Sequence, residues 1–168
     1  DTDGVVSNYN AFGTLAQDDG SFILNNTYNL GRTMTHEVGH YLGLRHIWGD
    51  GACSVDDFCD DTPNSDGANF GCAMDSSCGS MDMSENYMDY SDDSCMNTFT
   101  EDQKTRMLTV MMNSPRRMEL PTSIGCSAGT ASTNDIEVRL TCFTENICEV
   151  GFSPGIETVL QMKLLVTT

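Results

Sequence analysis

The chain has 168 residues, 39% of them hydrophobic, and carries a formal net charge of −17 at pH 7. This length suits one domain or one and a fraction, with enough apolar residues for a core. The charge argues against nucleic acid as a partner, because phosphate would be repelled along the whole surface; it is compatible with bound calcium, with basic peptide substrates or simply with solubility.

The N-terminal region shows neither an initiator Met nor a signal peptide, and no apolar run of the chain is long enough to span a bilayer. A chain that opens at Asp1 is therefore expected to be a processed or truncated product. Two short runs, GVVSNYNAF (4–12) and SFILNNTY (21–28), predict strands separated by the turn sequence QDDGS.

Residues 30–46 predict a helix followed by a turn, and residues 47–97 predict a loop, because Gly, Asp, Ser, Asn and Cys dominate there without a persistent period. A second helix is predicted over 98–113, where Thr98 and Glu101 have capping-box spacing. Pro115 ends this helix. Three of its apolar residues share one face: Met107, Leu108 and Met111. Beyond Pro121, the segments IEVRLTCF, ICEVGF and ETVLQMKLLV predict β-strands.

The cysteine count is eight, which is even and high for this length, and no CxxC pair is present, which argues against a zinc ribbon. Five of the eight lie in the loop between Cys53 and Cys95. This pattern predicts a loop held by disulfides in an oxidising compartment. Spacing alone leaves the pairing open, because eight cysteines allow 105 connectivities.

All three histidines of the chain lie within eleven residues, HEVGHYLGLRH, from His36 to His46. On a helix, His36 and His40 lie one turn apart on one side. Two histidines at this spacing can bind one zinc ion. The opposite side of the helix is apolar and is expected to bury it: Met34, Val38, Tyr41 and Leu42.

The residues around the histidines complete a catalytic pattern. Gly43 falls on the histidine side, where a larger side chain would crowd the metal, and it can end the helix with a positive φ. The chain can then turn and bring His46 up as a third ligand. Three protein ligands leave zinc one position for water, and Glu37 can take a proton from that water and pass it to the leaving amine.

Three other interpretations of this motif are disfavoured. Ordinary surface or core histidines would not need HExxHxxGxxH, which fixes five positions on a helix of the right phase and uses every His in the chain. A purely structural zinc site would not need Glu37. A hydrolase of another clan, with HExxH and a distant Glu ligand, would not need His46.

The signature HEVGHYLGLRH resembles that of the metzincin metallopeptidases, and NLGRTMTHEVGHYLGLRHIWGDGAC with the later ENYMDYSDDSCMNTFT resembles the pappalysin family within that clan. The resemblance covers residues 1–120. It implies that Met88 forms an apolar floor below the histidines and that Tyr90 binds zinc or stabilises the tetrahedral oxyanion. Trp48 and Tyr87 are expected to be packing residues.

The segment CSVDDFCDDTP carries Asp56, Asp57, Asp60 and Asp61, which would repel one another without a cation. Oxygen-rich clusters of this kind suit calcium. The pappalysin resemblance implies a calcium ion in this loop with Asp57, Asp60 and Thr62 as ligands. The alternative is a solvated acidic loop.

The resemblance also implies the disulfide pairing and a specificity determinant. In this family the Met-turn corresponds to NYMDY (86–90), and the chain after it lines the pocket for the residue that follows the scissile bond. Asp92 or Asp93 would therefore favour Arg or Lys in that pocket. The alternative is that both aspartates face solvent. The implied disulfides are Cys53–Cys78 and Cys72–Cys95, which leaves Cys59–Cys126 and Cys142–Cys148 as the remaining pairs.

We therefore expect an α+β fold in two parts. Residues 1–122 are predicted to form an N-terminally incomplete metzincin-like catalytic domain, with a partial upper-subdomain sheet, an active-site helix, a disulfide-stapled loop and a C-terminal helix. Residues 123–168 are predicted to begin an Ig-like β-sandwich. The predicted function is a secreted zinc endopeptidase acting on proteins or peptides; the alternative is a catalytically silent binding or adhesion fragment that keeps the metal site as a scaffold.

Overall fold

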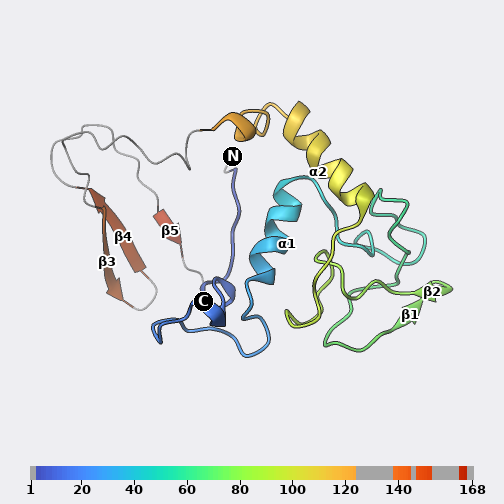
Figure 1. Cartoon of the computed structure of the whole chain (residues 1–168), viewed down its shortest axis with the longest axis horizontal. Coiled ribbons are helices and arrows are strands. Elements are labelled where there is room, and N and C mark those ends of the chain that lie inside the picture. Colours follow the sequence, from blue (N-terminus) through green and yellow to red (C-terminus); the bar gives the residue numbers. More distant parts are fainter. Residues whose placement is uncertain (1–2, 124–137, 145–146, 153–162, 166–168) are drawn as a thin grey trace. The chain divides into compact units, whose positions relative to one another are not determined.

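The computed structural model describes residues 3–123, 138–144, 147–152 and 163–165, and only the backbone of the last three segments. The chain divides into two units, Asp1–Thr122 and Ser123–Thr168, each described here by itself. Figure 1 labels the helices and strands, which are α1 (Arg32–Tyr41), β1 (Ser76–Ser77), β2 (Ser80–Met81), α2 (Glu101–Asn113), β3 (Val138–Thr144), β4 (Ile147–Phe152) and β5 (Lys163–Leu165).

The described N-terminal residues, from 3 to the start of α1, contain no strand. They form extended chain interrupted by two 3₁₀ turns, Tyr9–Ala11 and Leu15–Gln17, and one isolated bridge joins Thr14 to Leu30. The strands predicted over 4–12 and 21–28 were therefore wrong. Runs of β-formers become strands only where a neighbouring strand takes up their backbone hydrogen bonds, and none lies beside these runs in the described part of the chain.

Helix α1 starts at a glycine and takes its cap from a distant residue. Its N-cap, Gly31, has a φ of 80° and supplies no side chain. The Asp93 carboxylate replaces it, because Oδ2 accepts hydrogen bonds from the amides of Leu30 (2.7 Å) and Arg32 (3.2 Å). A negative charge at this end complements the helix dipole.

Helix α2 begins two residues later than a box at Thr98 and Glu101 requires, so that prediction was wrong. The N-cap is Thr100, whose hydroxyl accepts from the Gln103 amide while the Gln103 side chain accepts from the Thr100 amide. The buried Gln103 side chain also exchanges two hydrogen bonds with Asn86, at 2.9 and 3.1 Å. The helix ends at Asn113, because Ser114 adopts the extended conformation that a following proline favours.

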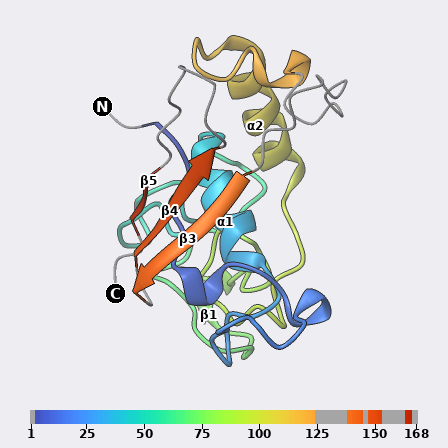
Figure 2. The same ribbon diagram turned by 90° about the vertical axis from the view of Figure 1, so that its left-hand side faces the viewer.

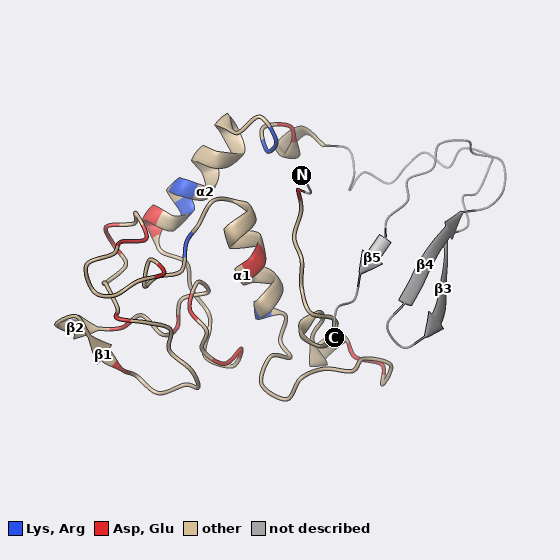
Figure 3. Cartoon of the chain, turned by 180° about the vertical axis from the view of Figure 1, so that it is seen from behind, with Lys and Arg blue, Asp and Glu red and all other residues tan. Residues whose placement is uncertain are grey.

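The loop between the helices holds only the two-residue strands β1 and β2, which pair antiparallel. Figures 1 and 2 show α2 beside the C-terminal end of α1. The core of the unit joins the start of the loop to the Met-turn, and its buried members are Leu44, Ile47, Trp48 and Met88. Figure 3 shows that most acidic residues of this unit lie on the loops rather than on the helices.

The side of α1 that was expected to be apolar and buried is only partly covered. Val38 is 39% exposed, whereas the buried residues of the helix are His36 and Gly39. The expected burial was therefore wrong at Val38: the histidine side faces the protein interior. No helix among the described residues combines the length and apolar character needed to cross a bilayer.

In the second unit, β3, β4 and β5 form an antiparallel sheet in that order. Each of the three strand-like segments predicted after Pro121 overlaps one of these strands, although β3 extends one residue beyond its segment, to Thr144. Cys142 and Cys148 are partners in the β3–β4 register. Their disulfide and the Ig-like sandwich both depend on parts of the chain outside the described residues and stay predictions.

Candidate metal centre

The C-terminal end of α1 reverses the direction of the chain, so that the following residues return toward His36 and His40. Gly43 has a φ of 89°, its amide donates to the His40 carbonyl (2.9 Å), and the Leu44 amide donates to the Gly39 carbonyl (3.0 Å). These two hydrogen bonds form a Schellman motif, which ends the helix after Tyr41. The chain then reverses, and His46 returns to the side that carries His36 and His40.

Gly43 has a different neighbour from the one expected. A Cβ at this position would lie 2.8 Å from Cγ2 of Val110 on α2, so the space that Gly43 leaves is occupied by the second helix. The expectation that a side chain here would crowd the metal was therefore wrong. Gly43 is required by its positive φ and by the close approach of α2.

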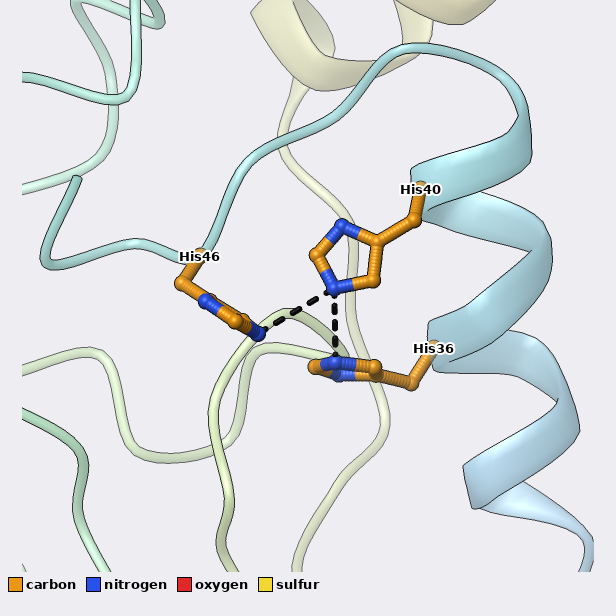
Figure 4. Close-up of side chains that lie close together, drawn as sticks. All are labelled: His36, His40 and His46. Carbon is orange, nitrogen blue, oxygen red and sulfur yellow. Dashed lines mark hydrogen bonds between the residues drawn. The ribbon is translucent and has the colours of Figure 1, made fainter. Parts of the chain in front are cut away.

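The three imidazoles converge through their Nε2 atoms (Figure 4). His40 Nε2 lies 3.0 Å from His36 Nε2 and 3.1 Å from His46 Nε2, and all three atoms lie within 4.8 Å of one another. Tetrahedral zinc with nitrogens at about 2.0–2.1 Å separates its ligands by about 3.3–3.4 Å. The spacing of the donor atoms therefore fits one zinc ion bound by these three histidines.

The other ring nitrogen of each histidine has its own acceptor. His36 Nδ1 lies 2.7 Å from the Tyr87 carbonyl, and His40 Nδ1 lies 3.0 Å from the Leu44 carbonyl. His46 Nδ1 contacts the Asp50 carboxylate. Donation from Nδ1 places the lone pair on Nε2, which is the tautomer that a metal ligand needs.

The first histidine is prepared for metal by burial. His36 is 6% exposed, and removal from water lowers its pKa to about 4 despite the opposing effect of the hydrogen bond to the Tyr87 carbonyl; the neighbouring imidazoles lower it further by smaller amounts. At pH 7 the ring is neutral and its Nε2 is free to bind a cation.

Met88 is completely buried, and its side chain packs against Gly39 of α1; the apolar floor below the histidines stays a prediction. A Cβ at Gly39 would lie 2.5 Å from the Met88 sulfur, so the glycine is what lets the helix approach this side chain. The Met88 amide donates to Asn86 Oδ1 (2.9 Å), and Asn86 is itself held by Gln103 of α2. The Met-turn is thus anchored to both helices.

Glu37 and Tyr90 line one cavity of about 330 Å³ together with His36. The Tyr90 ring centroid lies 5.6 Å from that of His36 and 4.9 Å from that of His46. Partial burial raises the pKa of Tyr90, and the charges of Asp50 and Glu37 raise it further. Its hydroxyl is therefore protonated at neutral pH and available as a donor.

The two aspartates after the Met-turn lie in different surroundings. Asp93 is 1% exposed and lines the same cavity as Glu37. Its Oδ2 caps α1, whereas its Oδ1 is buried without a hydrogen-bond partner. Asp92 is only partly buried and does not line the cavity. Of the two, Asp93 alone both lines the cavity and has a buried carboxylate oxygen without a hydrogen-bond partner.

The acidic loop does not gather its four aspartates around one point. Asp57 is 2% exposed, and its Oδ1 accepts from the Thr62 hydroxyl (2.7 Å) while its Oδ2 has no partner. Burial raises the pKa of this carboxyl. Asp61 Oδ2 instead accepts from the Asp102 amide in the first turn of α2, and Asp60 is exposed. Asp57 and Thr62 therefore fit a cation better than the rest of the loop.

Two disulfides cross this loop, Cys53–Cys78 and Cys72–Cys95, which are the pairs that the family resemblance implies. Cys59 is a buried free cysteine, and burial raises the pKa of its thiol to about 12. The predicted Cys59–Cys126 bridge depends on Cys126, which lies outside the described residues, so this pairing stays a prediction.

Two contacts of His46 were not anticipated from the sequence. Trp48, expected only to pack, stacks on the His46 ring with centroids 4.2 Å apart and planes 4° from parallel. Asp50 was not singled out at all. Its spacing of four residues from His46 was a weak signal, because these residues form a turn rather than a helix.

Known proteins similar to this chain are peptidases. At 49% identity over 83 residues, extracellular metalloprotease 1 of Coccidioides posadasii matches 48% of this chain and 30% of its own length. An extracellular metalloprotease of Sordaria macrospora is 46% identical over 101 residues, which are 53% of this chain and 35% of that protein. This chain thus spans about a third of the length of these curated relatives.

The solved structure of mature mirolysin from Tannerella forsythia, in complex with a cleaved peptide, matches 62% of this chain and 41% of its own. The identity is 43% and the TM-score is 0.51. The model of the M43 peptidase family, described as pregnancy-associated plasma protein-A, matches residues 9–112. This match covers more than half of the chain and confirms the pappalysin resemblance. This chain therefore belongs to the M43 peptidase family.

Proposed function

We propose that this chain is the catalytic part of an extracellular zinc endopeptidase. The observation that carries the proposal is the convergence of three histidines: His40 Nε2 lies 3.0 Å from His36 Nε2 and 3.1 Å from His46 Nε2. Glu37 lines the same cavity as His36. Similarity to proteins named extracellular metalloproteases and the two disulfides support secretion.

Zinc at this site, when bound, supplies a water of lowered pKa and a positive charge for the scissile carbonyl. Glu37 accepts a proton from the attacking water as that water adds to the carbonyl carbon. The same carboxyl then gives the proton to the leaving nitrogen as the peptide bond breaks. The Tyr90 hydroxyl donates a hydrogen bond to the carbonyl oxygen while negative charge develops there.

The substrate preference that we propose is a basic residue after the scissile bond. Asp93 Oδ1 is buried, lacks a hydrogen-bond partner and belongs to a residue that lines the cavity beside Glu37. A buried carboxylate oxygen without a partner is costly, and a guanidinium or ammonium group would supply the missing donor. Asp92 contributes less, because it does not line this cavity.

We further propose that a calcium ion stabilises the acidic loop through Asp57 and Thr62, with Asp60 as an additional ligand from the surface. The support is the unpartnered, buried Oδ2 of Asp57 beside the Thr62 hydroxyl. Calcium takes carboxylate and other oxygen ligands in flexible geometry.

The experiment that tests the peptidase proposal compares zinc content and cleavage of a mixed peptide library for the unsubstituted chain, for Glu37→Gln and for Glu119→Gln. Glu119 is exposed and provides a matched loss of one charge. We expect all three to bind one zinc, and Glu37→Gln to lose about 10²–10⁴-fold in rate. Equal rates for zinc-loaded Glu37→Gln and the unsubstituted chain would refute the role of Glu37. A zinc-loaded chain without peptidase activity would favour the binding-fragment alternative.

The preference is tested by measuring kcat/KM for two peptides that differ only in Arg or Leu after the cleaved bond. We expect Asp93→Asn to lower the Arg-to-Leu ratio at least tenfold, as expected when a buried charge loses its partner, and Asp92→Asn to change it little. The amide at position 93 keeps an oxygen that can cap α1. A ratio unaffected by Asp93→Asn would remove the proposed preference and leave the hydrolytic mechanism intact.

A further inference from the structure

The three candidate ligands differ in the chemistry behind them. His36 and His40 each direct Nδ1 at a backbone carbonyl, which is a neutral acceptor that no substitution removes. His46 directs Nδ1 at the side chain of Asp50, an ionic acceptor. Of the three candidate ligands, only His46 therefore has an Nδ1 acceptor that a substitution can remove.

The backbone at Asp50 favours glycine first, although aspartate and asparagine tolerate this conformation better than other residues. Its φ is 63°, and Gly49 before it has a φ of 61°, so two successive residues occupy the left-handed region. Glycine is the residue that such positions favour. A non-glycine residue is retained there where its side chain has a use, and the contact with His46 is the side-chain hydrogen bond that the structure shows for Asp50.

Contacts within the segment around His46 hold both its imidazole ring and its backbone in place. The Gly49 amide donates to the His46 carbonyl (2.9 Å), and Arg45 Nη2 donates to the Gly49 carbonyl (2.9 Å). Trp48 stacks on one face of the His46 ring and so fixes the ring plane. The hydrogen bond between Nδ1 and Asp50 then determines which edge of the ring faces the other two histidines.

We propose that Asp50 is a positioning residue for the zinc centre. Its carboxylate selects the tautomer of His46 with the lone pair on Nε2, orients that atom toward the other two histidines and makes the ring a stronger donor to the metal. The proposal rests on the zinc centre proposed above. It assigns to Asp50 no contact with substrate and no direct bond to the metal.

The test is the zinc dissociation constant, measured by competition with a chelator for the full 168-residue chain and three variants. Asp50→Gly removes the carboxylate and suits the positive φ, so the stability of its zinc-free form should equal or exceed that of the unsubstituted chain. Asp50→Asn keeps a neutral acceptor. Asp66→Asn, at an exposed position of the same loop, controls for the loss of one negative charge.

We expect Asp50→Gly to bind zinc about 10–100-fold more weakly, Asp50→Asn to lie between it and the unsubstituted chain, and Asp66→Asn to match the unsubstituted chain. Zinc binding by Asp50→Gly within twofold of the unsubstituted chain would overturn the proposal, as would an equal weakening in Asp66→Asn. Absence of zinc binding by the unsubstituted chain would instead refute the metal centre itself.

Discussion

Replacing Gly39 by alanine tests the packing of the completely buried Met88 side chain against α1. The added Cβ would lie 2.5 Å from the Met88 sulfur and 3.4 Å from Cδ1 of Leu44. Ordinary contacts between such atoms are about 3.5–4.0 Å long, so the sulfur has to move by roughly 1 Å. Met88 is completely buried and has little free space to move into.

Two opposing effects decide the outcome of Gly39→Ala. Alanine gains about 1 kcal/mol over glycine in a helix interior. Overpacking of a filled core costs about 1–3 kcal/mol, and a contact this short belongs in the upper part of that range. We therefore expect the free energy of unfolding to fall by about 1–2 kcal/mol. In a Met88→Val background, which lacks the obstructing sulfur, the same change should instead stabilise the protein by up to about 1 kcal/mol.

The assay is urea unfolding of the zinc-stripped chain, followed by the fluorescence of Trp48. This is the single tryptophan of the sequence, and it belongs to the core that contains Met88. With an m-value of about 2 kcal/mol/M, the expected loss moves the midpoint by about 0.5–1 M. Unchanged or higher stability of Gly39→Ala alone, or an equal effect in both backgrounds, would refute the packing argument.

Three further predictions concern pH, the turn after α1 and calcium. The pKa of His36 is about 6.5 in the unfolded chain and about 4 in the folded chain, so the unfolded chain takes up the proton first as the pH falls. The zinc-free chain should therefore lose about 2 kcal/mol of stability between pH 7 and pH 5, and urea melts of His36→Asn should show no such loss. Gly43→Ala should cost about 2 kcal/mol in the same melts, from a strained φ and from contact with Val110, and equal stability would contradict this. Calcium at a hundred times its dissociation constant should stabilise the chain by about 2.7 kcal/mol in thermal melts, and Asp57→Asn should abolish the effect; coincident melts with and without calcium would remove the calcium ion.

The elements that local sequence defines were predicted best. Helix α1 has its periodic histidines and a glycine that ends it, and both features act within a few residues. Helix α2 shows the limit, since Thr98–Glu101 and Thr100–Gln103 both fit a capping box. The second box forms because Gln103 pairs with Asn86 in the Met-turn, a partner that no local pattern indicates.

The site shows the same division between local and distant information. The three histidines and Glu37 follow one short motif, so their common location was predictable from spacing. Asp93 was one of two adjacent candidates, and only the fold shows which one is buried in the cavity wall. Asp50 was not predicted, because its carboxylate reaches His46 only through two successive residues in the left-handed backbone conformation.

X-ray absorption at the zinc edge of the reconstituted chain tests the central claim most directly, since it separates sulfur from lighter ligand atoms and recognises imidazole rings by the scattering of their outer atoms. The account predicts one zinc per chain with three imidazole nitrogens at about 2.0–2.1 Å and no sulfur. A sulfur scatterer at about 2.3 Å, or fewer than three imidazoles, would contradict a centre formed by His36, His40 and His46.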